Sequence, residues 1–218
     1  PQDADEAFDL LWSFLQLAPS IHARTDDSNG AVGDVLRSAV ELLATISPRL
    51  TIKPNLLAER IVVAVAEAGY GEFDGIIPAM AEALGVEGLT HLKQITEAWA
   101  AAAPTPQEIA QFRQFGLSTS PMDLARRQRQ STASIILADI ADLQGDVDAF
   151  MARYSAEQLT YGTIAPDVAR RLIDAGRLDE ALVIIQRARA AEDGKSFRSS
   201  RYDLDDVYGL AGPQEVSL

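Results

Sequence analysis

Helical periodicity recurs along the whole chain and constrains its fold more than any other feature. Apolar residues three and four positions apart mark an amphipathic segment about every 15 to 25 residues, which is the spacing that lines one face of an α-helix. Hardly any segment shows the alternation of apolar and polar residues that a half-buried strand needs. Glycine and proline separate the amphipathic segments. The sequence therefore predicts an all-α fold.

The expected helices follow from these apolar stripes and from the residues that interrupt them. Segment 55–68 is apolar on more than one side, so we expect a core helix covered by neighbouring helices. Trp12 and Trp99 lie on apolar stripes, and we expect both to be buried. The expected helices span about residues 3–18, 31–47, 55–68, 73–84, 89–103, 105–115, 121–143, 147–154, 168–175 and 178–191.

The organisation along the chain is that of one extended helical domain. We expect a helical-repeat-like domain over residues 1–195, with residues 1–118 and 119–195 as an alternative division into subregions. Residues 196–218 are expected to form a tail or a truncated further helix. Since the sequence begins at Pro1, with no methionine and no signal-peptide pattern, we expect a fragment of a longer protein.

Composition excludes several classes of site and partner. The chain has no cysteine, so it has no disulfide, catalytic thiol or thiolate metal site, and a reducing cytosol is the expected compartment. No apolar run approaches the roughly 18 residues that a membrane span requires. The net charge of −13 disfavours binding to a nucleic-acid backbone. The expected partner is therefore a protein or a small molecule, with no nucleic acid and no membrane.

Charge is distributed unevenly along the chain. Residues 1–109 carry 16 acidic and 6 basic side chains, and residues 110–218 carry 16 acidic and 13 basic ones. Arginines of the second half could form a basic face, but such residues usually cover a solvated helix face and pair with nearby acids. We adopt the second interpretation for Arg126, Arg127, Arg129, Arg153, Arg170 and Arg171.

A short motif near the end of the helical region resembles a known repeat. Residues 175–182 read AGRLDEAL, which is similar to the turn and second-helix start of a tetratricopeptide unit, where glycine permits a tight turn and alanines let helices approach. No second copy occurs at a 34-residue offset. The expected architecture is therefore an irregular α-solenoid, a stack of antiparallel helical hairpins similar to tetratricopeptide or HEAT repeats, and not a regular array.

Longer blocks of the chain resemble a bacterial family that is described only as a domain of unknown function. These blocks are residues 9–33, 69–92 and 165–188, the first two of which read DLLWSFLQLAPSIHARTDDSNGAVG and GYGEFDGIIPAMAEALGVEGLTHL. The resemblance implies a helical, repeat-like cytoplasmic protein. The family has no established activity, so the resemblance supplies no catalytic residues for this chain.

One loop, residues 22–30, gathers most of the side chains with chemical potential. Its imidazole, guanidinium and carboxylates could together bind a cation or a polar ligand, and the candidate ligand-binding residues are His22, Arg24, Asp26, Asp27 and Asn29. The alternative is that residues 26–29 hydrogen-bond their own turn and cap the following helix, which is the ordinary use of such residues.

Metal sites of known pattern do not fit this loop. If Gly30 is aligned with the invariant glycine of a calcium loop, Thr25 occupies the first ligand position and Leu36 the bidentate acidic position. A zinc site needs more nitrogen or sulfur ligands than the loop offers, and the chain's other histidine, His91, lies in a distant helix and is given no role. We therefore expect no metal and no cofactor.

Signals of catalysis are missing from the sequence. Carboxylate pairs such as Asp205 and Asp206 have no nucleophile oriented against them, and no catalytic residue can be assigned. The leading hypothesis is a non-enzymatic helical-repeat module that mediates protein–protein interaction. The alternative is a small-molecule-binding or cation-binding domain that uses loop 22–30.

Overall fold

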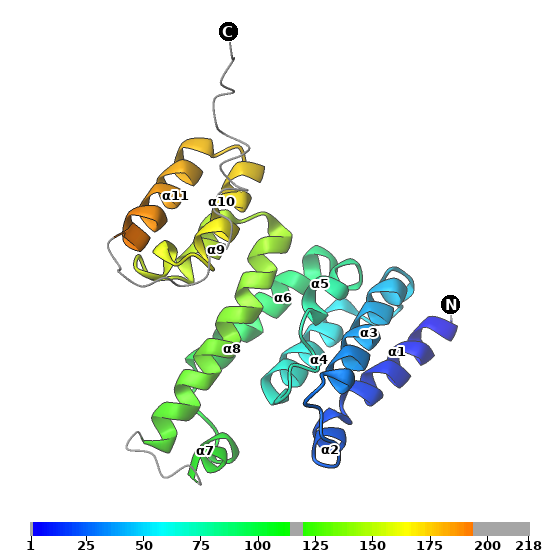
Figure 1. Cartoon of the computed structure of the whole chain (residues 1–218). Helices are drawn as coiled ribbons and strands as arrows, with labels where there is room; N and C mark the ends of the chain where they lie inside the picture. The colour runs from blue at the N-terminus through cyan, green and yellow to red at the C-terminus, as the bar shows by residue number, and fades with distance from the viewer. Residues whose placement is uncertain (1, 114–119, 194–218) are drawn as a thin grey trace. The chain divides into compact units, whose positions relative to one another are not determined.

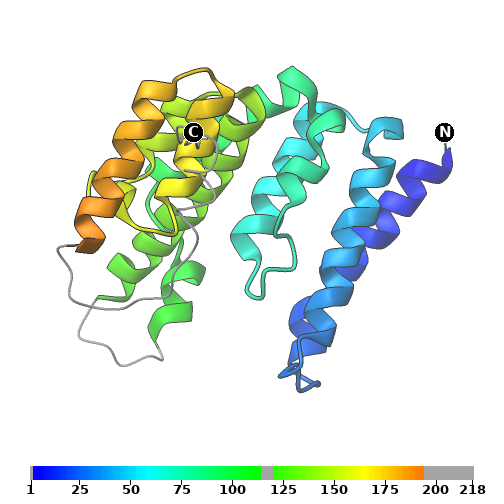
Figure 2. The same cartoon turned by 45° about the horizontal axis from the view of Figure 1, so that its top comes forward.

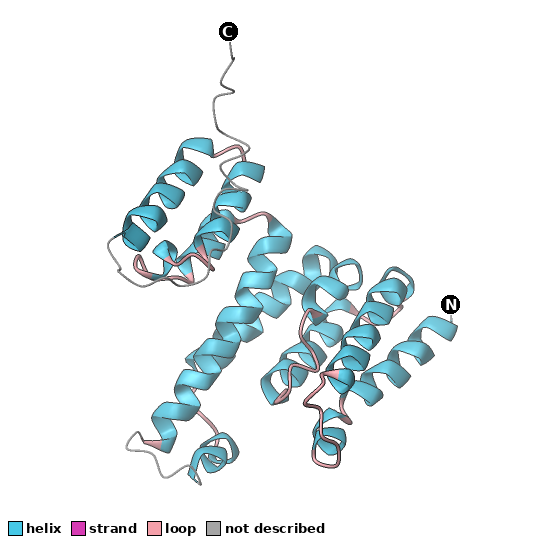
Figure 3. Ribbon diagram, viewed as in Figure 1, coloured by secondary structure: helices cyan, strands magenta, loops and turns pink. Residues whose placement is uncertain are grey.

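The computed structural model describes residues 2–113 and 120–193, and in those residues every regular element is a helix (Figures 1 and 3). The prediction of an all-α fold is confirmed. The chain divides into two compact units, Pro1–Leu143 and Gln144–Leu218. The predicted tail, residues 196–218, lies outside the described residues.

The first unit is built from helices. Their bounds are α1 Gln2–Leu15, α2 Ala18–His22, α3 Ala31–Ile46, η1 Ser47–Arg49, α4 Pro54–Glu67, α5 Ile76–Ala79, α6 Ala81–Ala101, α7 Pro106–Phe112 and α8 Pro121–Gln144. α1 lies beside α3 in both views, and α4 packs along α6 (Figures 1 and 2). Two predicted helices, 73–84 and 89–103, are replaced by the short α5 and the long α6, whose backbone is non-helical at Gly85.

One hydrophobic core holds α1, α3, α4, α5 and α6 together. Trp12 is 2% exposed, as predicted, and its ring lies 5.1 Å from the ring of Phe8 and 5.0 Å from that of Phe73. Trp99, which was also expected to be buried, is only half-buried. The largest fully buried side chains of this unit are Phe8, Leu15, Leu43, Leu57, Ile61, Ile76, Ile77, Met80, Leu84, Leu92, Ile136 and Ile140.

Gly88 allows the close approach of α6 to α4. A Cβ atom at this position would lie 3.1 Å from the Cβ of Pro54 and 3.0 Å from a methyl carbon of Leu84. Contacts this short would require Pro54 or Leu84 to shift by a few tenths of an ångström. Gly88 falls between the predicted helices 73–84 and 89–103, but in the structure it is a packing residue inside α6.

A buried guanidinium joins α6, α7 and α8. Arg129 of α8 is 4% exposed, and its Nη1 donates to the carbonyl oxygens of Trp99, Ala102 and Ala103 at 3.0, 3.0 and 3.2 Å. Its Nε donates to Glu108 of α7 at 3.1 Å, and its Nη2 donates to the second oxygen of the same carboxylate. The prediction that Arg129 belongs to a solvated helix face is wrong, because the carbonyls at the end of α6 and the Glu108 carboxylate surround it.

The same ion pair makes the stability of the first unit pH-dependent. Burial raises the pKa of the Glu108 carboxyl, but hydrogen bonds from Arg129 and Thr105 lower the pKa by more, so that it lies below its ordinary value of 4.5. A carboxyl with a depressed pKa stabilises the fold above its unfolded-state pKa, and the stabilisation is lost as the pH falls through the folded-state pKa.

We therefore expect Glu108→Gln to be destabilising at about pH 7 and less destabilising at about pH 3, because the stabilisation by the wild-type carboxylate is lost as the pH falls from the unfolded-state pKa through the folded-state pKa. Urea unfolding at both pH values measures this difference. Glu41→Gln, which removes the same charge from an exposed site on α3, is the control for net charge. An equal effect of Glu108→Gln at the two pH values would contradict the expectation.

The second unit is a smaller group of helices. It contains α9 Val147–Ala152, η3 Gln158–Thr160, α10 Ala165–Asp174 and α11 Leu178–Asp193. The helices predicted on either side of Gly176 are present, and α10 packs against α11 across a tight turn (Figure 1). Gly176 adopts φ +74°, a conformation that favours glycine. The buried face of this unit consists of Val147, Phe150, Ala165, Val168, Ala169, Leu172, Ala181, Ile184, Ile185 and Ala188.

An ion-pair cluster ties α9 to the turn between α10 and α11. Arg177 donates to Asp148 at 2.8 Å and to Glu180 at 2.7 Å. Hydrogen bonds from Arg177 lower the pKa of Glu180. Two further arginines pack over aromatic rings, since the guanidinium carbons of Arg171 and Arg153 lie 4.0 and 5.4 Å from the ring centre of Phe150.

Candidate functional site

The predicted polar loop begins at the end of α2, a short helix that the sequence interpretation did not include. His22 is the last residue of α2, and its imidazole stacks on the ring of Tyr70, with ring centres 4.4 Å apart and planes 13° from parallel. Within the described residues, the buried Nε2 of His22 has no hydrogen-bond partner. Arg24 is exposed and its Nε donates back to the carbonyl of Ser20 at 3.0 Å.

The acidic residues of the loop form local hydrogen bonds with the backbone. Asp27 accepts from the amides of Val32 at 2.7 Å and Gly33 at 3.2 Å, so both of its oxygens are engaged at the start of α3. Asp26 accepts from the amide of Ser28 at 3.0 Å, and Asn29 accepts from that of Ala31 at 3.1 Å. These bonds are the ones that the capping alternative describes.

Capping by Asp27 gives a measurable prediction. Asp27→Ala removes the acceptor of two amides in the first turn of α3, so we expect the free energy of unfolding of the first unit to fall by about 1–2 kcal/mol. Asp26→Ala removes one bond within an exposed turn and should cost less. Urea titration followed by tryptophan fluorescence measures both changes, because both tryptophans lie in this unit. A larger loss for Asp26→Ala would contradict the assignment of the cap.

No three histidine, aspartate or glutamate side chains in residues 2–113 and 120–193 lie close enough together to hold a metal ion. The structure brings His22 against Tyr70, but it turns the carboxylates of Asp26 and Asp27 toward backbone amides. The five candidate residues thus share one segment, but Arg24, Asp26, Asp27 and Asn29 bond to separate backbone groups, and His22 stacks on Tyr70.

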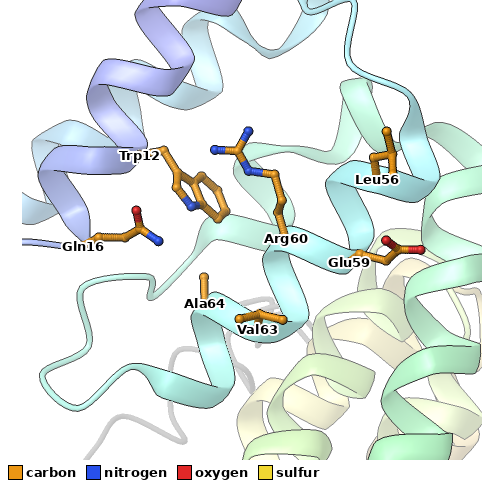
Figure 4. Close-up of a pocket in the computed structure, with 7 residues that line it drawn as sticks. All are labelled: Trp12, Gln16, Leu56, Glu59, Arg60, Val63 and Ala64. Atoms are coloured by element: carbon orange, nitrogen blue, oxygen red, sulfur yellow. The ribbon is translucent and has the colours of Figure 1, made fainter.

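A groove of about 480 Å³ lies along α4 at its contact with α1 (Figure 4). Trp12 forms part of its floor, and the Arg60 side chain lies beside the indole. The guanidinium carbon of Arg60 is 5.2 Å from the ring centre of Trp12 and 4.8 Å from that of Phe8, and Nη1 donates to Asp9 at 3.0 Å. The groove is lined by Trp12, Gln16, Leu56, Glu59, Arg60, Val63 and Ala64.

Two exposed apolar residues run along the outer face of α4. Leu56 and Val63 are seven positions apart, or about two helical turns, and therefore lie on the same face. Their side chains are 52% and 54% exposed. The prediction that neighbours cover this helix is wrong for this face, although the opposite face of α4 is buried. The buried residues of α4 are Leu57, Ala58, Ile61, Val62 and Ala64.

Carboxylates flank this apolar face on the side of α6. Glu59 lies 3.3 Å from Nε2 of His91, and Glu87 accepts from the side-chain amide of Asn55 at 3.0 Å. A second hollow, of about 470 Å³, adjoins these groups and includes Val86, which is 83% exposed. The structure thus places His91, which the sequence gave no role, at the edge of the outer face of α4.

The functional candidates that sequence reasoning missed are the residues of this face. Leu56 and Val63 belong to segment 55–68, which was expected to be a core helix covered by neighbouring helices. The available signal was the pair Glu59 and Arg60, which interrupts the apolar pattern on the same side of the helix as Leu56 and Val63. Two charged residues on the outer side of α4 indicate that this side is partly solvated.

In its described residues the chain is all-helical, and its first unit carries an exposed, partly apolar groove. A model of a family of unknown function, DUF6880, matches residues 1–208, so the chain belongs to that family. Comparison with curated proteins and with solved structures gives no match. Among the described helices, none has the length and apolar character that crossing a lipid bilayer requires.

Proposed function

We propose that this chain is a non-enzymatic helical-repeat module that binds another protein, and that the groove along α4 is its binding surface. The observation that supports this function is the exposure of Leu56 and Val63 in one groove with a polar rim. Grouped apolar side chains surrounded by polar ones are characteristic of protein-binding surfaces. The rim of the groove is polar, since Arg60 pairs with Asp9 and the Glu59 carboxylate lies 3.3 Å from Nε2 of His91.

The architecture behind this proposal is an irregular α-solenoid of tetratricopeptide-like hairpins. It is supported by the packing of α10 on α11 across Gly176, and by the side-by-side pairs α1–α3 and α4–α6. Solenoids bind partners along extended helical surfaces, so a groove between helices is the expected location of the site. The absence of cysteine supports a cytoplasmic setting.

Site-specific cross-linking in cells tests the proposal. A photoreactive amino acid is placed at Val63 or, as a matched control, at Leu42 of α3, which is also 54% exposed. After irradiation in the native host, the products are identified by mass spectrometry. We expect the Val63 position to give a specific protein adduct that the Leu42 position does not give. Identical products at both positions, or no protein adduct at Val63, would overturn the proposal.

The second candidate function is binding of a small molecule or cation by loop 22–30. It is favoured by one observation, the buried Nε2 of His22, which has no hydrogen-bond partner among the described residues. If this function is correct, a ligand from the host should raise the melting temperature of the wild-type protein and not that of the Asp26→Asn, Asp27→Asn double variant. An unchanged ligand effect in the double variant would exclude the loop.

A further inference from the structure

We propose that the occupant of the α4 groove is an amphipathic helix of another protein, with apolar anchors two turns apart and Lys or Arg residues beside them. This inference rests on the proposed function, because it names the kind of partner that the same groove takes. It is argued from the geometry of the apolar face, from the burial of the aromatic residues and from the charges around the groove.

The spacing of the exposed apolar residues fits a helical partner. Leu56 and Val63 lie about two turns apart, roughly 10 Å along the axis of α4. A partner helix that lies along α4 presents apolar residues at the same interval, from positions i and i+7. All backbone groups of a helix are paired internally except at its ends, so a helix can dock on an apolar face without leaving polar groups unsatisfied.

Two other modes of peptide binding fit this surface poorly. Binding of an extended strand needs an open sheet edge, and the described part of the chain contains no strand. Binding of a polyproline helix needs exposed aromatic rings that line a groove. The aromatic residue of this groove, Trp12, is 2% exposed and is covered by Arg60.

The charges around the groove favour a basic partner. Asp9 of α1, Glu59 of α4 and Glu87 of α6 lie around the outer face of α4, and Glu67 is exposed one turn beyond Val63. Arg60 compensates Asp9, and Lys53 precedes the first turn of α4. Acidic groups therefore predominate from Glu59 onward, in agreement with the excess of acidic residues in positions 1–109. Complementary charge on the partner would speed association and select the partner.

A library of helical peptides tests this inference directly. The peptides are about 14 residues long, with apolar anchors at i and i+7 and with Lys, Glu or Gln varied at the flanking positions. The library is selected on the full chain. Peptides enriched in Lys are then measured at low and high salt against wild type, Glu59→Lys/Glu87→Lys, Val63→Asp and the control Leu42→Asp. Circular dichroism confirms that each variant is folded.

We expect Val63→Asp and the double charge reversal each to weaken binding of the Lys-rich peptides at least tenfold, and Leu42→Asp to leave it within twofold. High salt should also weaken binding. Enrichment of Glu-rich or uncharged peptides that still depend on Val63 would overturn the basic partner and leave the groove as a protein-binding surface. The inference would be overturned if binding were insensitive to Val63→Asp or if no peptide were enriched. The cross-linking result at Val63 then decides separately whether the proposed function also fails.

Discussion

Replacing Arg129 with methionine is expected to lower the free energy of unfolding of the first unit by about 3–5 kcal/mol. The substitution keeps much of the side-chain volume but removes the charge that the Glu108 carboxylate faces. It also leaves the carbonyl oxygens at the end of α6 without their donor. Breaking a buried ion pair from one side is costly because the remaining charge stays partly desolvated. Urea unfolding followed by tryptophan fluorescence measures the change.

Three further variants separate the ion pair from the general effect of removing an arginine. Arg127→Met removes an exposed arginine from the same helix, and we expect a change within about 0.5 kcal/mol. Arg129→Lys keeps the charge but cannot make the two-pronged contact with Glu108, so its loss should be intermediate. The double variant Arg129→Met/Glu108→Met should recover part of the loss, since it leaves no charge unpaired. Equal stability of Arg129→Met and wild type would show that the guanidinium contributes nothing to the fold.

Local rules predicted most of the helices and the hydrogen bonds of one loop. The helix periodicity depends on neighbours three and four residues away, and proline and glycine end or start helices through their own backbone geometry. The cap formed by Asp27 is of the same local kind. The short helix α2 was missed because Pro19 was taken as the end of a helix, whereas it occupies the first turn of the next one.

Long-range contacts could not be predicted from these rules. Arg129 is buried because of Trp99 and Glu108, which are 30 and 21 residues away in the sequence. His22, at the end of α2, stacks on Tyr70, which follows the end of α4. In each case the sequence shows a polar residue in a polar neighbourhood, and only the packing of distant segments decides whether it is solvated.

The candidate groove was missed for a related reason. An apolar residue on a helix predicts burial only if another element covers its face. The pair Glu59 and Arg60 indicates that one side of α4 is partly solvated, but the sequence of α4 does not say which other segments cover the helix. Ile61 and Val63 are both β-branched and two positions apart, but Ile61 is fully buried and Val63 is 54% exposed. The difference arises from the positions of α1 and α6 beside α4, and it separates the core from the proposed binding surface.

Trp12→Ala is expected to lower the free energy of unfolding of the first unit by about 3–5 kcal/mol. The indole is 2% exposed and lies between Phe8, Phe73 and the guanidinium of Arg60, so its removal leaves a cavity among side chains from three segments. Trp99→Ala is the matched comparison. Trp99 is half-buried, so its truncation removes less buried area, and we expect a loss of about 1–2 kcal/mol.

Urea unfolding followed by far-ultraviolet circular dichroism suits both tryptophan variants, since each lacks one fluorophore.

The comparison of the two variants also tests whether the indole of Trp99 positions the Arg129 guanidinium. The guanidinium carbon of Arg129 lies 5.1 Å from the ring centre of Trp99. If Trp99→Ala proves as damaging as Trp12→Ala, the indole of Trp99 must be needed to position Arg129, and Trp99→Ala should then add little to Arg129→Met in the double variant. If Trp99→Ala causes only a small loss in the free energy of unfolding, and this loss adds to that of Arg129→Met, the indole is not needed. The hydrogen bonds to Glu108 and to the carbonyls of α6 then position the guanidinium by themselves.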